Sequence, residues 1–161
     1  MEPSSFWERL EALPWVEHIA ITWWFPFLES VHVLAVAILV GLVASIDLRL
    51  LGKAGRTLEA DRLLVELERW AFAALLLALP TGALMFLTRA SHYVANGPFR
   101  LKMLFLLLLG LNLLVVRRRL GSVVDRSPGA ATFGTAITCS AGLSLFLWCA
   151  TVFAGRWIGH S

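Results

Sequence analysis

Apolar residues fill four long stretches of the chain, and short polar segments separate them. The stretches cover about residues 26–51, 70–88, 98–116 and 131–158. A hydrocarbon core about 30 Å thick requires about 20 mostly apolar residues in a helix, and each stretch is close to that length or longer. Because backbone groups inside a bilayer must be bonded within the protein, packed helices are the economical solution. The pattern predicts an all-α fold, an integral membrane four-helix bundle that forms a single membrane domain over residues 1–161.

The first 25 residues have a different, amphipathic pattern. Phe6, Leu10 and Leu13 fall on one helical face, and acidic residues and a proline interrupt any continuous apolar core. These interruptions, and the absence of a basic beginning, argue against a signal peptide. We predict a short interfacial helix over about residues 5–13 that lies on the membrane surface. A helix that binds a partner is the alternative interpretation.

The composition agrees with a membrane protein and excludes several other classes. Hydrophobic residues make up 58% of the 161 residues and charged residues only 16%. A soluble domain has nearer ~45–50% apolar and ~25% charged residues. Disorder, a nucleic-acid-binding domain and an ordinary cytosolic enzyme are therefore excluded. The two cysteines, Cys139 and Cys149, lie about 15 Å apart along the same predicted helix, so we expect unpaired and buried thiols.

The basic residues predict the orientation in the membrane. The loops after the first and third apolar stretches, together with the residues that flank them, carry nine of them: Arg49, Lys53, Arg56, Arg62, Arg69, Arg117, Arg118, Arg119 and Arg126. The opposite side carries five: Arg9, Arg89, Arg100, Lys102 and Arg156. Loops on the cytoplasmic side are enriched in Lys and Arg. We therefore expect a multi-pass protein of a bacterial inner membrane with both termini in the periplasm.

Five polar side chains are expected at one depth, close to the periplasmic side. Glu29 and His32 share a face of the first helix, and Lys102 lies in the first turns of the third. Arg89 ends the second helix, and Arg156 lies in the last turns of the fourth. Ionisable groups within a membrane span are costly and are functional candidates by default. This convergent layer predicts a binding site.

A neutral imidazole at this depth is able to bind heme iron, another metal or a proton. The apolar face that continues below His32 suits a flat macrocycle, with heme b as the cofactor and His32 as its axial metal ligand. Arg89, Lys102 or Arg156 then supplies a cation for the propionates. In the structural alternative, Glu29 pairs with Arg156 or Lys102, and His32 only satisfies a neighbouring group.

Further polar positions have mainly structural interpretations. The sequence Pro-Thr-Gly at 80–82 predicts a kink in the second helix, which either widens the bundle for a ligand or serves packing. We expect Asp47 and Arg49 to cap and anchor the first helix, and Asn112 to form an interhelical hydrogen bond. His92, in the loop after the second helix, is the candidate for a second axial ligand.

Five motifs keep their order along the chain: FPFLESVH (25–32), DLRLLG (47–52), TGALMF (81–86), PFRLKM (98–103) and AGRWI (154–158). In their order and spacing they resemble the pattern of an uncharacterised bacterial family of four-helix integral membrane proteins. The resemblance covers about residues 20–158. It implies a fold and not an activity.

The layout is similar, more distantly, to two characterised groups. One is the heme-binding membrane protoporphyrinogen oxidase family, in which a first-helix histidine and a third-helix lysine are important; His32 and Lys102 match these positions. Leu111 and Asn112 stand where that family has an aromatic residue and a histidine, so the resemblance does not extend to the oxidase activity. The other group is the copper-resistance D domain, although soft donors are sparse in this chain.

The sequence therefore favours a heme-b-binding, electron-carrying membrane protein with His32 as axial ligand. Its expected partners are the lipid bilayer and a redox partner or membrane complex. A copper-handling membrane protein and a cofactor-free subunit or scaffold are the alternatives.

Overall fold

The computed structural model describes residues 6–52, 58–124 and 135–158, and these ranges contain helices and no strand. The helices are α1 (Phe6–Glu11), α2 (Pro14–Ile21), α3 (Trp24–Leu50), α4 (Leu58–Leu87), α5 (Ala90–Ala95), α6 (Gly97–Val124) and α7 (Thr135–Trp157). Four segments are long and apolar enough to cross a membrane: Trp24–Leu50, Glu66–Leu87, Gly97–Val116 and Thr135–Trp157. The chain is a multi-pass membrane protein with an all-α fold, as the sequence predicts.

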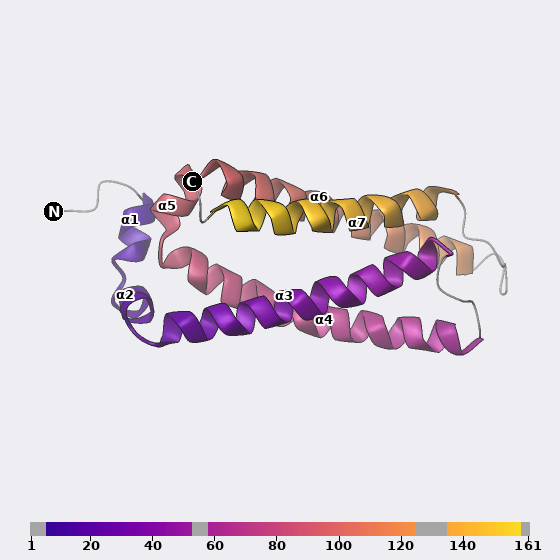
Figure 1. Ribbon diagram of the computed structural model, residues 1–161, viewed down its shortest axis with the longest axis horizontal. Helices are drawn as coiled ribbons and strands as arrows, with labels where there is room; N and C mark the ends of the chain where they lie inside the picture. The colour runs from indigo at the N-terminus through magenta and orange to yellow at the C-terminus, as the bar shows by residue number, and fades with distance from the viewer. Residues whose placement is uncertain (1–5, 53–57, 125–134, 159–161) are drawn as a thin grey trace.

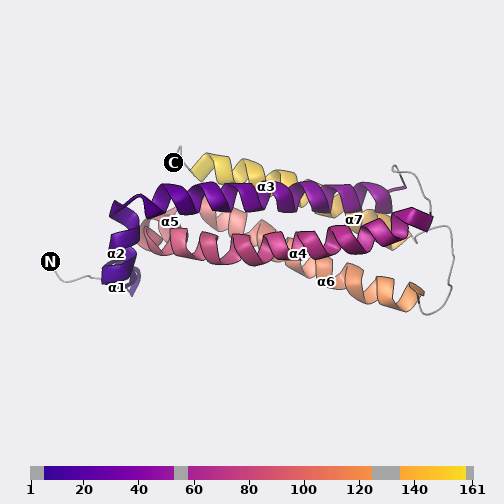
Figure 2. The same ribbon diagram turned by 90° about the horizontal axis from the view of Figure 1, so that it is seen from below.

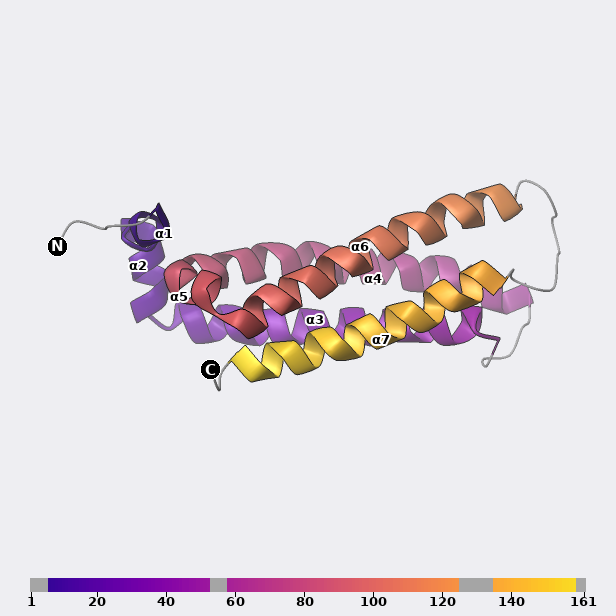
Figure 3. The ribbon, with the colours of Figure 1, turned by 90° about the horizontal axis from the view of Figure 1, so that it is seen from above.

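The four long helices form two layers (Figure 1). One layer is α3 with α4, seen from the front in Figure 2, and the other is α6 with α7, seen from the front in Figure 3. Neighbours within each layer pack closely, whereas the two layers meet mainly where α3 contacts α7. The short helices α1, α2 and α5 lie together at one end of the bundle (Figure 1).

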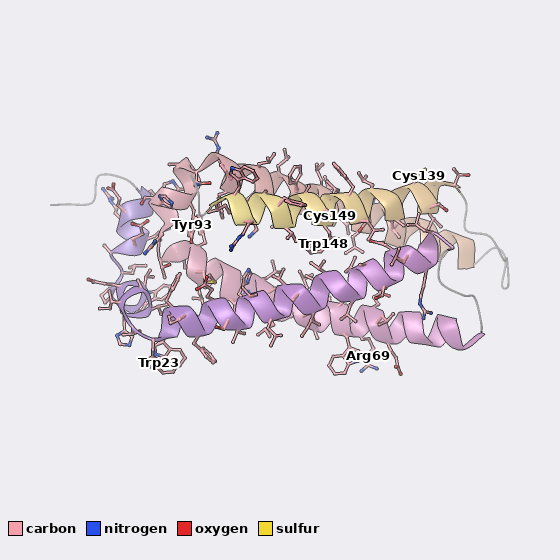
Figure 4. The ribbon with its side chains drawn as sticks, viewed as in Figure 1. Trp23, Arg69, Tyr93, Cys139, Trp148 and Cys149 are labelled. Atoms are coloured by element: carbon pink, nitrogen blue, oxygen red, sulfur yellow. The ribbon has the colours of Figure 1, made fainter. Side chains whose placement is uncertain are left out.

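Small residues bring α3 and α4 together. Ala71 and Ala74 of α4 pack against Leu39 of α3 in one buried cluster, and the spacing of three residues places both alanines on the same helical face. Residues without large side chains let backbones approach closely, which is how membrane helices associate. Trp148 of α7 packs against this cluster and lies between the layers in Figure 4. Its side chain therefore joins the second layer to the middle of the first.

The two cysteines correct one expectation. Both thiols are free, as predicted, but Cys139 and Cys149 are exposed and not buried. The buried face of α7 includes Ile137 and Thr151, each two residues away from one of the cysteines. Two residues correspond to about 200° around a helix, so both thiols lie on the opposite face. In Figure 4 both labelled side chains lie on α7.

The end of the bundle with α1, α2 and α5 contains more helix than the sequence predicts. Instead of one helix over residues 5–13, the structure has α1 and a separate α2, because Pro14 begins a new helix and Leu13 before it is extended (φ −66°, ψ 130°). Likewise, His92 and Tyr93 lie within α5 and not in an irregular loop.

The short helices are fastened to each other at this end. The Ser91 backbone N–H and its hydroxyl both donate to Glu11 Oε1, at 2.6 and 2.7 Å. Beside this contact, Trp7 packs edge-to-face on Phe86, which stacks on Phe99. Polar and aromatic contacts together hold α1 over the ends of α4 and α6, next to the predicted polar layer.

The α3–α4 contact predicts the result of a paired substitution. Ala74→Leu should destabilise the purified protein by about 1–3 kcal/mol, because added methylene groups must fit between packed helices. Ala73→Leu, on the exposed side of α4, should change stability by less than about 0.5 kcal/mol. Thermal unfolding in detergent measures both. Equal loss in the two variants would show that Ala74 does not lie in a tight helix contact.

Candidate functional site

His32 lies on α3 and is bonded to α4. Its Nδ1 atom is 3.0 Å from the carbonyl oxygen of Ala78 and 3.0 Å from Oγ1 of Thr81. The Thr81 hydroxyl lies 2.7 Å from the carbonyl oxygen of Leu77 and 3.1 Å from that of Ala78, so its proton is already engaged. The half-buried imidazole is thus held by two oxygen atoms of one helical turn.

This geometry fixes the tautomer of a neutral imidazole. The Ala78 carbonyl can only accept a hydrogen bond, so Nδ1 of His32 must carry the hydrogen and donate it. The other ring nitrogen, Nε2, then keeps its lone pair. No hydrogen bond reaches Nε2 from the described part of the chain. His32 therefore presents one free nitrogen, the atom that a histidine uses to bind a metal.

The Pro80–Gly82 segment shapes α4 to receive the ring. The helix continues through Pro80, whose missing N–H leaves one carbonyl of the preceding turn without its helical donor. The Thr81 hydroxyl and the His32 ring donate to the next carbonyls along this turn, those of Leu77 and Ala78. A Cβ at Gly82 would lie 2.8 Å from Cε1 of His32. The space at this glycine is therefore filled by the imidazole.

Lys102 is the second member of the site. Its side chain runs along α7, and its Nζ atom is 3.6 Å from the position that a Cβ of Gly155 would occupy. Lys102 is partly buried and close enough to His32 for the two groups to interact electrostatically. The structure thus brings together the two residues that the sequence predicts on α3 and α6, with contacts from α4 and α7.

The other three predicted site residues do not join this pair. Glu29, Arg89 and Arg156 are all exposed. Glu29 lines an open hollow of about 540 Å³ on the outer side of α3, and Arg89 stands at the beginning of α5. No ion pair joins Glu29 to Arg156, so the predicted bridge between the first and last long helices is wrong. Of the five residues predicted in the polar layer, His32 and Lys102 are therefore partly buried, whereas the other three are exposed.

Other metal donors are scattered in the described parts of the chain. These parts contain no group of three or more His, Cys, Asp or Glu residues that could hold an ion. Met85 is half-buried on α4, whereas Met103 on α6 is exposed. His92 is exposed on α5 and contacts Tyr93 edge-on. His32 is therefore the nitrogen donor around which a site is built.

A comparison with known families assigns the chain. A family model described as a family of unknown function (DUF6644) matches residues 6–161. The chain belongs to this family. The match agrees with the uncharacterised membrane family that the motifs resemble. It does not relate the chain to the protoporphyrinogen oxidase family or to copper-resistance proteins. No curated protein and no solved structure matches the chain.

Two interhelical contacts of this DUF6644 chain were not expected from the sequence. Thr81 is part of the TGALMF motif, but its bond to His32 depends on a helix pairing that no sequence spacing reveals. Asp47, expected to cap and anchor α3, is instead buried and hydrogen-bonded to Ser144 of α7. The available signal was an acidic residue inside an apolar helix. Asn112 does form the predicted interhelical bond, 3.0 Å from its Nδ2 to the Ser140 carbonyl.

The close approach of Gly82 and His32 predicts a reversal of the usual glycine effect. Gly→Ala within a helix normally stabilises by up to about 1 kcal/mol. Gly82→Ala should instead destabilise, because the new methyl group displaces the imidazole from its two oxygen partners. Gly142→Ala is the matched control, since nothing lies within 4 Å of its Cβ position. Thermal unfolding of both variants tests this, and equal stabilisation would contradict the described ring position.

Proposed function

We propose that this protein binds heme b in the membrane, with His32 Nε2 as an axial ligand, and carries electrons. The observation that supports this function best is the bond from His32 Nδ1–H to the Ala78 carbonyl. Histidines that bind metals donate their other ring N–H to a carbonyl or carboxylate, which fixes the tautomer and the ring orientation.

The residues present fit such a group. The free Nε2 supplies an iron ligand, and Thr81 with Ala78 supplies the bonds that orient it. Bound heme b supplies one-electron chemistry. The protein's own part is to hold the imidazole, to exclude water and to place positive charge nearby.

Lys102 is the proposed partner of a propionate. Its ammonium group is close enough to the imidazole to interact with it electrostatically, and no carboxylate of the described residues forms an ion pair with it. An ammonium group in a poorly solvated position gains much from an anionic ligand. Arg89 and Arg156, which are exposed at the same end, are further candidates for this contact.

The two alternative functions have weaker support. A copper-handling protein requires a set of soft or imidazole donors, and no such cluster occurs in the described ranges. A cofactor-free scaffold explains the hydrogen bonds of His32 but gives no role to the partly buried ammonium group of Lys102. An absorption spectrum of the purified protein, together with its metal content, distinguishes the three.

We further propose that the protein lies in a bacterial inner membrane with both termini in the periplasm. The supporting observation is the distribution of basic residues, nine on one side and five on the other. In this orientation His32 and Lys102 lie near the periplasmic surface. The heme and its redox partner, or a membrane complex, would then exchange electrons on that side.

The heme proposal predicts a different loss of heme binding for each of three substitutions in the site. His32→Ala should abolish or strongly reduce heme content, because the iron–nitrogen bond is lost. Lys102→Met should weaken heme binding by roughly 1.5–3 kcal/mol, about one to two powers of ten in Kd, while the Soret band remains. Thr81→Val should weaken it by about 10–100-fold, because the ring loses an orienting bond. Heme content and the Soret band of protein purified from heme-replete cells measure these effects.

The matched control for His32→Ala is His18→Ala, which removes an exposed imidazole from α2 at the same end of the molecule and should leave the spectrum unchanged. If the parent protein carries no heme, or if His32→Ala keeps the heme content and Soret position of the parent, His32 is not the ligand.

The orientation is tested by cysteine labelling in a background without Cys139 and Cys149. His92→Cys on α5 should react with an impermeant reagent added from outside, and Arg118→Cys on α6 should not, although both positions are exposed. His92 is a better probe than the adjacent Ser91, whose hydroxyl is bonded to Glu11. The reverse labelling pattern would place the termini and the site on the cytoplasmic side.

A further inference from the structure

Asp47 lies where α3 contacts α7, far from His32. The two residues are separated by fifteen positions on α3, which is about 22 Å of helix. Asp47 is only 5% exposed. The hydroxyl of Ser144 on α7 donates a hydrogen bond to its carboxyl group. The Oδ2 atom, however, is buried and has no hydrogen-bond partner within the part of the chain that the structure describes.

The surroundings of this carboxyl group are apolar. Leu50 of α3 packs with Ile137 and Ala141 of α7 in a buried cluster at the same helix contact. Ile46, the residue before Asp47, packs against that cluster. An ionised carboxylate at this position loses its hydration and regains only one hydrogen bond, from a hydroxyl group. Its burial therefore costs free energy. A carboxyl group that carries a proton avoids most of this cost.

Within the ranges that the structure describes, the helices packed around Asp47 place few charged groups toward it. From α7, the residues between Thr135 and Gly155 contribute no charge, and the only titratable groups there are the outward thiols of Cys139 and Cys149. From α4, the described charged side chains at this end are exposed: Glu66, Glu68 and Arg69. On α3 itself, Arg49 follows two residues later, which corresponds to about 200° around the helix and so to another face.

We propose that the Asp47 carboxyl group, held by the Ser144 hydroxyl, is a proton-binding site at the α3–α7 contact. A proton from the nearby aqueous phase bonds to Oδ2, and release is the reverse of this step; no electron is transferred. The path from the aqueous phase to the carboxyl group is short, because Asp47 lies three residues, about one helical turn, before the end of α3. The proposal does not depend on heme binding.

The position of the site gives the proton a structural effect. The contact between α3 and α7 is the main connection between the two helix layers. When the proton is bound, this contact contains a neutral hydrogen-bonded pair. When the proton leaves, the contact contains a charge among apolar side chains. Proton release at higher pH therefore weakens the connection between the layers, and proton binding at lower pH restores it.

Infrared difference spectroscopy of the full-length protein tests the site directly. The parent protein should show the carbonyl band of a protonated carboxylic acid that disappears as the pH is raised. Asp47→Asn should lack this band. Glu29→Gln, which removes an exposed carboxyl group from the same helix, should keep it. The band should persist in heme-free protein, so that a failure of the heme proposal leaves this test intact.

Ser144→Ala provides a second test if Asp47→Asn does not fold. The acid remains, but its carboxyl group loses a hydrogen-bond donor, so the band should move to higher wavenumber and not disappear. The parent should also unfold at a lower temperature as the pH rises through the disappearance of the band. A band that survives in Asp47→Asn, an unshifted band in Ser144→Ala, or no pH-dependent acid band in the parent would each overturn the proposal.

Discussion

In this bundle the Nδ1–H group of His32 bonds to a backbone carbonyl of the neighbouring helix, and the rest of the site depends on that bond. Inside a membrane there is no water to satisfy an imidazole, so its N–H must find an oxygen atom in the protein. The Ala78 carbonyl and the Thr81 hydroxyl provide it, at 3.0 Å each. One bond therefore orients the ring, selects the tautomer and leaves Nε2 without a hydrogen. Gly82 permits it by leaving room for the ring.

The same requirement for close helix approach shapes the whole fold. Alanines of α4 bring it against α3, and small residues of α7 bring it against α3 and the Lys102 side chain. The two layers meet mainly through α3 and α7. Each end of the bundle contains a polar side chain that is buried or partly buried among the helices. The end that carries α1, α2 and α5 holds the imidazole and the ammonium group. The other end holds the Asp47 carboxyl group, which is buried beside apolar side chains.

Much of this architecture is predictable from the sequence, because apolar length and helical periodicity act locally. The four membrane helices follow from that pattern, and His32 and Lys102 follow from the cost of ionisable groups in lipid. The partners of these residues do not follow, since the rotation of each helix is set by packing against its neighbours. Depth alone suggested an ion pair between Glu29 and Arg156, but both side chains face outward. The burial of Asp47 was missed for the same reason.

The central claim is that the protein presents the Nε2 nitrogen of His32 by fixing the hydrogen on Nδ1. Nitrogen NMR of protein labelled in its histidine side chains tests it most directly, with His32→Asn identifying the signals of this residue. In heme-free protein the account predicts a single neutral tautomer, with a protonated Nδ1 that exchanges slowly with solvent and an unprotonated Nε2. A signal from the tautomer with hydrogen on Nε2, or rapid averaging of the two nitrogens, would contradict the account.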